Sequence, residues 1–111
     1  MSSGIYKAPK KSAFSCESYG SEFEKDFMDE LEKDSRVTKW TKNHAIRIPY
    51  VNIDSKVAHY NPDFLVEYAD GTQELVEIKG KNMLTEITKR KQKAAKEWCV
   101  KRDIKYRLIT L

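Results

Sequence analysis

The segment Tyr60-Asn-Pro-Asp-Phe-Leu-Val-Glu-Tyr68 is followed by Ala69-Asp-Gly-Thr72 and then by Gln73-Glu-Leu-Val-Glu-Ile-Lys-Gly80. The two outer parts are rich in β-branched and aromatic residues and enclose an Asp-Gly pair, so they predict two strands joined by a tight turn. An aspartate directly follows proline in the first strand, and the second strand ends in Glu-Ile-Lys. Two acids and a lysine on one small sheet can hold a divalent metal and position a water beside a phosphate.

The length of the turn decides whether the two acids meet. A two-residue loop at 70–71 would leave Asp63 and Glu77 on opposite faces, because side chains alternate along a strand. A three-residue loop at 69–71, ending in a left-handed glycine, places Asp63 directly across from Glu77. Gly71 stands where such a loop prefers its glycine, so we expect the three-residue loop.

This register predicts a nuclease that hydrolyses phosphodiester bonds with one or two Mg²⁺ or Mn²⁺ ions. Asp63 and Glu77 would bind metal, and Lys79, on the same face as Glu77, would orient or deprotonate the water and offset phosphate charge. The acid-x-Lys pattern is weak alone, since it recurs at 54–56 and 103–105. Only the middle copy lies on a strand that returns beside Asp63. The residues alone leave a surface salt-bridge cluster as an open alternative.

Composition favours one intracellular domain with a polyanionic partner. The chain has 111 residues, no apolar run long enough to span a membrane, and two cysteines too far apart for a metal or redox motif. We therefore expect a reduced, cytoplasmic protein with no small-molecule cofactor. Residues 20–34 hold seven acids and two lysines, whereas residues 79–111 hold eleven Lys or Arg and three acids. The basic third suggests nucleic acid, although a solvated lysine-rich helix face explains it equally well.

The remaining pattern predicts an α/β domain. Residues 1–19 are polar and basic without periodicity, which indicates a flexible N-terminal arm, and the domain proper would span 20–111. The expected order is αβββαβ, with a four-stranded mixed sheet flanked by helices and a last strand parallel to its neighbour. The expected elements are a helix from Ser21 to about 34, strands at 44–50, 58–68 and 73–79, a loop at 82–85, a helix to about 102, and a strand at 105–111.

The first helix has a marked start and one apolar face. Ser21 and Glu24 form a capping-box pattern, which gives Glu24 a structural role at the helix N-terminus. Apolar residues then recur at helical spacing and predict the buried face: Phe23, Phe27, Met28 and Leu31.

Over about residues 18–111 the sequence resembles the PD-(D/E)xK nuclease superfamily, and more closely the catalytic domain of TnsA-type transposon endonucleases and the nuclease domain of type III restriction enzymes. The matching motifs are Ser21-Glu-Phe-Glu-Lys-Asp-Phe27, Tyr60-x-Pro-Asp-Phe64, Leu75-Val-Glu-Ile-Lys-Gly80, Lys93-Ala-Ala-x-x-Trp-Cys99 and Tyr106-Arg-Leu-Ile-Thr110. The resemblance implies a restriction-endonuclease-like core and DNA cleavage. The length of the chain favours a small stand-alone nuclease of the kind that phages or mobile elements encode.

The resemblance also implies roles for single residues. Glu24, with Glu22 as the fallback, would help Asp63 and Glu77 to bind metal, together with the backbone carbonyl of Ile78, and Lys79 would be the catalytic lysine. TnsA itself has glutamine at the second acid position, so Glu77 follows the wider superfamily pattern, and a role in transposition is weakly supported.

Substrate contact and assembly are further expectations. Cutting both strands requires two active sites, which favours a homodimer, whereas a monomer would nick. The alternatives are a catalytically inactive DNA-binding module of the same fold and a branched-DNA resolvase. His44 and His59 are expected to be structural or surface residues, since the metal mechanism needs neither. The basic residues expected to contact the nucleic acid are Lys81, Lys89, Arg90, Lys93 and Lys96.

Overall fold

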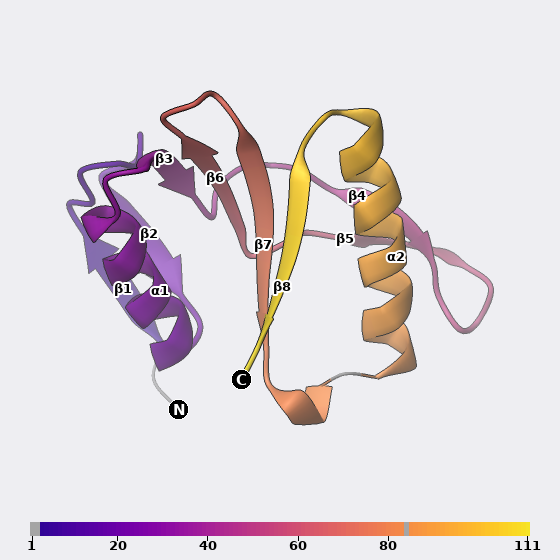
Figure 1. Cartoon of the computed structure of the whole chain (residues 1–111). Helices are drawn as coiled ribbons and strands as arrows, with labels where there is room; N and C mark the ends of the chain where they lie inside the picture. The colour runs from indigo at the N-terminus through magenta and orange to yellow at the C-terminus, as the bar shows by residue number, and fades with distance from the viewer. Residues whose placement is uncertain (1–2, 84) are drawn as a thin grey trace.

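A four-stranded mixed sheet forms the centre of the protein in the computed structural model, which describes residues 3–83 and 85–111 (Figure 1). The neighbouring strands β3 and β6 are antiparallel, as are β6 and β7, and β8 runs parallel to β7. The sequence predicts this mixed sheet and its parallel last strand, and both are confirmed. In spatial order the strands are β3 (Val37–Thr41), β6 (Phe64–Tyr68), β7 (Gln73–Lys79) and β8 (Lys105–Thr110).

One helix covers each face of this sheet (Figure 1). The helix α1 (Glu22–Lys33) buries Phe27, Met28 and Leu31 in a core that includes side chains of β3, β6 and β7. On the other face, α2 (Glu86–Lys101) buries Ala95 and Cys99 in a core with residues of β7. Strand alternation explains the division, because neighbouring residues of β7 point into different cores.

The start of α1 is as the sequence predicts. The Ser21 side chain accepts a hydrogen bond from the Glu24 backbone N–H at 3.3 Å, and the Gly20 N–H donates to the Glu24 carboxylate at 3.0 Å. These contacts satisfy free N–H groups at the helix N-terminus. Phe23, which we expected to be buried, is 56% exposed. The buried stripe of α1 therefore begins at Phe27.

The N-terminal segment differs from the flexible arm that the sequence suggests. Strands β1 (Gly4–Lys7) and β2 (Cys16–Tyr19) form an antiparallel hairpin. Its Tyr6 hydroxyl donates to Asp29 of α1 at 2.7 Å, and the backbone N–H groups of Lys10 and Lys11 donate to the Glu32 carboxylate. Tyr6 and Tyr19 also pack against the core that α1 covers, but the residues that hold the hairpin form no apolar periodicity in the sequence. The domain boundary after residue 19 stays a prediction, and residues 1–2 lie outside the described residues.

A second hairpin contains one of the expected core strands and the first part of another. Strands β4 (Ile48–Val51) and β5 (Val57–Tyr60) pair only with each other. The prediction of a core strand at 44–50 is wrong, because β3 takes that place in the sheet. Pro49 lies within β4 and is exposed. Proline has no N–H to donate, so within sheets it occurs in edge strands such as this one.

The strand predicted at 58–68 is divided. A bend at residues 61–63 separates β5 from β6, where Pro62 cannot donate to a ladder. With both hairpins present, the order αβββαβ is not reproduced element for element. The short helix η1 (Lys81–Met83) precedes α2, and residue 84 of the predicted loop is outside the described part. Within residues 3–83 and 85–111, no helix is long and apolar enough to cross a membrane.

Candidate active site

The β6–β7 hairpin has the register that brings the two motif acids together. Glu67 pairs with Gln73 and Phe64 with Val76, and the same register carried to the start of β6 sets Asp63 against Glu77. The three-residue loop 69–71 is closed by the Tyr68 N–H, which donates to the Thr72 carbonyl at 2.9 Å. Gly71 has a φ of 87°, the left-handed conformation that this loop requires. The predicted loop and register are confirmed.

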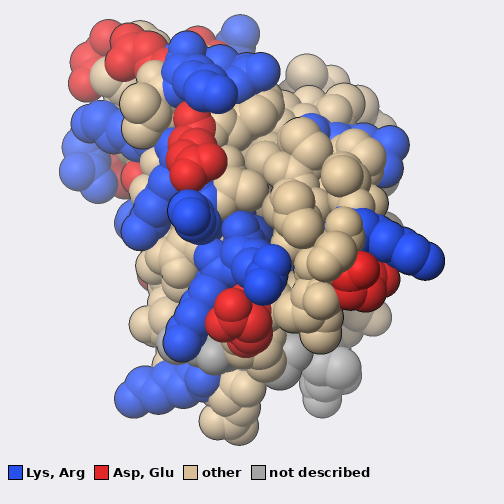
Figure 2. All heavy atoms as spheres, turned by 90° about the vertical axis from the view of Figure 1, so that its right-hand side faces the viewer, with Lys and Arg blue, Asp and Glu red and all other residues tan. Residues whose placement is uncertain are grey.

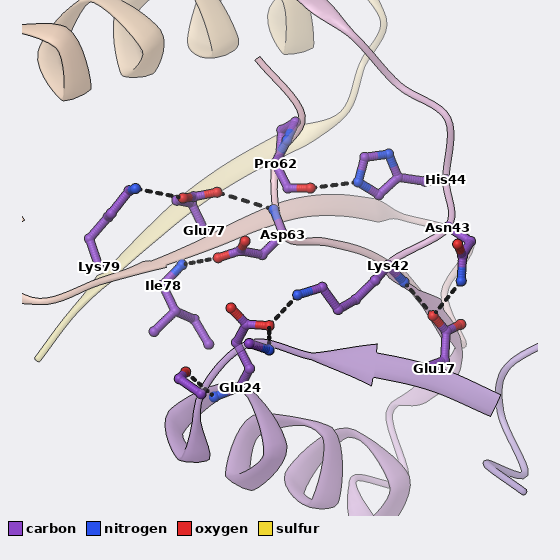
Figure 3. A network of polar contacts seen from close by, with 12 residues as sticks. Glu17, Glu24, Lys42, Asn43, His44, Pro62, Asp63, Glu77, Ile78 and Lys79 are labelled. Atoms are coloured by element: carbon purple, nitrogen blue, oxygen red, sulfur yellow. Dashed lines mark hydrogen bonds and ion pairs between the residues drawn. The ribbon is translucent and has the colours of Figure 1, made fainter. Parts of the chain in front are cut away.

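Two hydrogen bonds cross between the acids and the opposite backbone (Figure 3). The Asp63 N–H donates to Oε1 of Glu77 at 3.1 Å. In return, Oδ2 of Asp63 accepts from the Ile78 N–H at 3.0 Å. Each carboxylate is therefore held by the strand that carries the other, and one oxygen of Asp63 is left without a protein donor among these bonds.

Aromatic and imidazole groups hold the surroundings of this pair. The Tyr60 hydroxyl donates to Oε1 of Glu77 at 3.0 Å and lies 3.0 Å from the Tyr106 hydroxyl. His44 accepts at Nδ1 from the Ile46 N–H, so its Nε2 carries the proton and donates to the Pro62 carbonyl at 2.6 Å. His44 thus has the structural role that we expected, and it fixes the chain next to Asp63.

Burial makes the acid pair costly to ionise. Desolvation is the main cause that raises the pKa of Glu77, and the nearby Asp63 charge raises it further. Desolvation also raises the pKa of Asp63, with the Glu24 charge adding to the effect and the Ile78 hydrogen bond opposing it. A cation placed between the two carboxylates would remove this cost, so the arrangement suits a metal-binding pair electrostatically.

Lys79 is the cation already present at Glu77. Its Nζ lies 3.5 Å from Oε2 of Glu77, and both side chains are mostly buried. The two residues are two positions apart on β7 and so project from the same face. The structure thus brings Asp63, Glu77 and Lys79 together as the sequence predicts.

Glu24 approaches the pair from α1, but it is bound to a lysine that sequence reasoning missed. Nζ of Lys42 forms an ion pair with Oε1 of Glu24 (Figure 3), and the side chains are only 19% and 15% exposed. Nζ of Lys42 also lies over the Phe64 ring, 5.3 Å from the ring centroid. It follows β3 in a segment without a motif, so no sequence signal marks it. Glu22, the fallback ligand, is exposed.

Glu17 is the second residue that the sequence did not single out. It is 1% exposed and lies on β2, within the segment expected to be an arm. Its carboxylate accepts from the Lys42 N–H at 3.0 Å and from the Asn43 side chain at 3.0 Å. The hydroxyls of Ser12 and Thr41 also donate to it. A buried carboxylate with four donors is a strong local anchor.

A preformed cage of three metal ligands is not present. Over residues 3–83 and 85–111, no group of three or more His, Cys, Asp or Glu side chains is placed to hold a metal ion. Asp63 and Glu77 form a pair, whereas Glu24 is occupied by Lys42. The metal roles of Glu24, Asp63, Glu77 and the Ile78 carbonyl therefore stay predictions.

Comparison with known families places the hairpin in context. The family model described as TnsA-like endonuclease N terminal matches residues 34–111, which is most of the chain. The chain belongs to this family. No curated protein matches it. The resemblance to TnsA-type endonucleases that the motifs carry is thereby confirmed.

The family match includes only part of the site. It covers the β6–β7 hairpin with Asp63, Glu77 and Lys79, and also Lys42. It does not cover β1, β2 and α1, so Glu17 and Glu24 lie outside the matched residues. In this TnsA-like chain, the N-terminal segment adds contacts to a site whose motif residues lie in the family region.

The predicted nucleic-acid contacts lie on α2 and η1. Figure 2 shows Lys and Arg side chains in a broken band on the side where α2 and the β4–β5 hairpin lie. Lys89, Lys93 and Lys96 are exposed on α2, and Lys81 is exposed in η1. Arg90 differs, because its guanidinium contacts Glu86 at 3.5 Å and donates to the carbonyl of Val51 at 3.2 Å. Lys89, Arg90 and Lys93 also line a pocket of about 600 Å³ between α2 and β4.

Proposed function

We propose that this TnsA-like protein is a metal-dependent endonuclease that hydrolyses DNA phosphodiester bonds with Mg²⁺ or Mn²⁺. The observation that carries the proposal is the Asp63–Glu77 pair, cross-bonded between two strands with Lys79 at 3.5 Å from Glu77. Membership of an endonuclease family supports it independently. A surface salt-bridge cluster would not need two buried acids whose pKa values are both raised.

The donor set fits a hard divalent cation. Mg²⁺ prefers carboxylate and carbonyl oxygens, and one or two carboxylates plus substrate phosphate and water suffice to bind it. Asp63 and Glu77 supply those carboxylates, and the backbone carbonyl of Ile78 is the third proposed ligand. When bound, the ion would lower the pKa of a water molecule and neutralise charge at the phosphate. Two ions, one for the attacking and one for the leaving oxygen, are the alternative stoichiometry.

Each residue of the proposed active site has a separate role. Asp63 and Glu77 hold the cation, and the crossed backbone bonds keep both carboxylates in place without induced movement. The Lys79 ammonium stabilises negative charge on the phosphate and orients the attacking water by donating a hydrogen bond to it. Tyr60 donates to Glu77 and so fixes the orientation of that carboxylate.

DNA is the proposed substrate because the exposed lysines of α2 suit a polyanion. Lys89, Lys93 and Lys96 would contact phosphates, which positions a duplex without reading its sequence. Lys81 follows the motif directly and would contact a phosphate nearer to the acids. A homodimer would supply two active sites for a double-strand cut.

Cleavage of supercoiled plasmid, linear duplex and a four-way junction tests the proposal. Each DNA is incubated with the protein in Mg²⁺, Mn²⁺ or EDTA, and nicked and linear products are separated on gels. We expect cutting with either metal and none in EDTA. Nicking alone would indicate a monomer, whereas direct linearisation would support a homodimer. Preferential cutting of the junction would indicate a resolvase.

Two results would overturn the proposal. Cutting that persists in EDTA would rule out the metal-dependent mechanism. Binding of all three DNAs with no cutting in either metal would identify a catalytically inactive DNA-binding module. Light scattering in the presence and absence of DNA would determine the oligomeric state separately from activity.

A further inference from the structure

Three acids lie in a row that is closed by a lysine at each end. Figure 3 shows the order Lys79, Glu77, Asp63, Glu24 and Lys42. Lys79 pairs with Glu77 at one end, and Lys42 pairs with Glu24 at the other. The motif accounts for Lys79, whereas Lys42 has no assigned role.

The Lys42–Glu24 contact is a buried, directed ion pair. Both side chains are largely withdrawn from water, and Nζ of Lys42 bonds Oε1 of Glu24. The same oxygen also accepts from the Gly20 N–H at 3.0 Å. Oε1 of Glu24 is therefore already bonded to a protein cation and a protein N–H, so a metal ion that binds this oxygen must compete with the Lys42 ammonium.

The backbone fixes Lys42 in this position. Glu17 accepts from the Lys42 N–H and from the Asn43 side chain, and it also accepts from the Thr41 hydroxyl at 2.7 Å. These three consecutive residues are thus tied to one buried carboxylate on β2. Nζ of Lys42 also lies over the ring of Phe64, 5.3 Å from its centroid. The ammonium is held at Glu24 by the fold and does not sample solvent freely.

We propose that Lys42 is a positioning residue that withholds Glu24 from the metal site in the resting protein. A divalent cation then binds first to Asp63 and Glu77, and recruits Glu24 only by displacing the Lys42 ammonium. The released ammonium is left beside the site, where a substrate phosphate would accept it. This inference rests on the proposed metal dependence, which it extends to the order in which the acids are engaged.

Metal titration of four proteins tests the competition without DNA. The affinity for Mn²⁺ is measured by calorimetry for the wild type, K42M, E24Q and the double variant E24Q/K42M. Methionine is close to lysine in length and removes the charge. We expect K42M to bind Mn²⁺ about tenfold more tightly, because a nearby like charge and a competitor for Glu24 are both lost. E24Q should change the affinity much less in the wild type than in the K42M background.

Two controls separate competition from general charge and from folding. K39M removes an equal charge from an exposed position on β3 and should leave the affinity unchanged. K42R keeps the charge and should behave as the wild type. Circular dichroism of each variant shows whether it is folded. Equal Mn²⁺ affinity of K42M and the wild type, with both folded, would overturn the inference.

The wild-type protein supplies a measurement that needs no variant. Lysine acetylation with limiting reagent is quantified by peptide mass spectrometry, with and without Mg²⁺. We expect Lys42 to react slowly in the metal-free protein and several-fold faster with Mg²⁺, while Lys39 stays constant. Unchanged Lys42 reactivity at saturating metal would also overturn the inference.

The outcomes distinguish this inference from the proposed function. If the wild type binds metal and cuts DNA, and K42M has the same metal affinity, the role of Lys42 is ruled out while the proposed nuclease function stands. Failure of both the wild type and folded K42M to bind Mn²⁺ would contradict the metal dependence and, with it, the competition. Binding of Mn²⁺ by K42M alone would support the competition most strongly.

Discussion

The backbone N–H of Asp63 donates to the Glu77 carboxylate at 3.1 Å, and the Asp63 carboxylate accepts from the residue after Glu77 at 3.0 Å. The two acids are thus locked to each other through the backbones of adjacent segments. Because the bonds depend on strand register, the site depends on the loop at the other end of the hairpin. The chemistry and the fold can therefore be tested through the same structural unit.

The loop itself gives the first prediction. Gly71 has a φ of 87°, and a Cβ there would meet nothing within 4 Å, so an added methyl group strains the backbone without a clash. We expect G71A to destabilise the protein by about 1–2 kcal/mol, the cost of a left-handed L-residue. G71N should cost less, because asparagine tolerates this conformation better. Urea unfolding measures both, and equal stability of G71A and the wild type would contradict the assigned loop.

The second prediction concerns the stability cost of the buried acids. Burial first, and then the Glu24 charge, raise the pKa of Asp63 above its usual 3.8. A raised pKa in the folded state means that the protonated carboxyl contributes to stability. This contribution is fully present below the unfolded pKa and is lost as the pH rises through the folded pKa, so the ionised carboxylate opposes folding at neutral pH. D63N should therefore stabilise the metal-free protein at neutral pH by about 0.5–2 kcal/mol.

The pH dependence of that gain provides its control. The advantage of D63N over the wild type should disappear as the pH falls through the raised pKa towards 3.8. D26N, at an exposed aspartate of α1, should show no such gain. Thermal unfolding in EDTA across this pH range is the measurement. A lower stability of D63N at neutral pH would show that the carboxylate is not electrostatically strained.

The third prediction tests whether the N-terminal segment is ordered. Glu17 accepts four hydrogen bonds while 1% exposed, so E17A leaves buried donors unsatisfied and should destabilise the protein by about 3 kcal/mol or more. S18A, at the exposed neighbour on the same strand, should stay within about 0.5 kcal/mol of the wild type. Urea unfolding and limited proteolysis measure the effect. Equal stability of the two variants, with cleavage of residues 4–19 in the wild type, would restore the flexible arm.

The fourth prediction concerns the basic face. K89Q/K93Q/K96Q should bind duplex DNA more weakly, and its plot of log affinity against log salt should be shallower by roughly three, about one per phosphate contact. The control K25Q/K33Q/K39Q removes three lysines from α1 and β3 instead. Fluorescence anisotropy in EDTA measures both without cutting. Identical slopes for the two triple variants would place the DNA contact elsewhere.

The central hairpin could be predicted because its signals are local. Alternation along β7 and the glycine at position 71 together determine the register, and the register determines which face carries Glu77 and Lys79. The cap of α1 at Ser21 is likewise read from residues three apart. In such cases, the physics that forms the element acts over a few neighbouring residues.

The parts that the sequence did not reveal depend on distant contacts. Three of the residues that donate to the buried Glu17 lie 24 to 26 positions away, and the backbone of Lys42 is bonded to Glu17 through one of these contacts. The β4–β5 hairpin was misread as part of the sheet, since an alternating pattern does not state which strand a segment pairs with. The polar composition of residues 1–19 likewise suggests a flexible arm, although polar groups of this segment bond it to the rest of the fold.

The most direct test compares plasmid cleavage by K79M with cleavage by K56M and K105M. The last two change the lysines of the other acid-x-Lys sequences, which lie in the β4–β5 turn and at the start of β8. In Mg²⁺ we expect K79M to cut about 10²–10³-fold more slowly than the wild type, as expected for a lost charge-stabilising group, while remaining folded and able to bind DNA. K56M and K105M should cut at wild-type rates. Wild-type cutting by folded K79M would contradict an active site built from Asp63, Glu77 and Lys79.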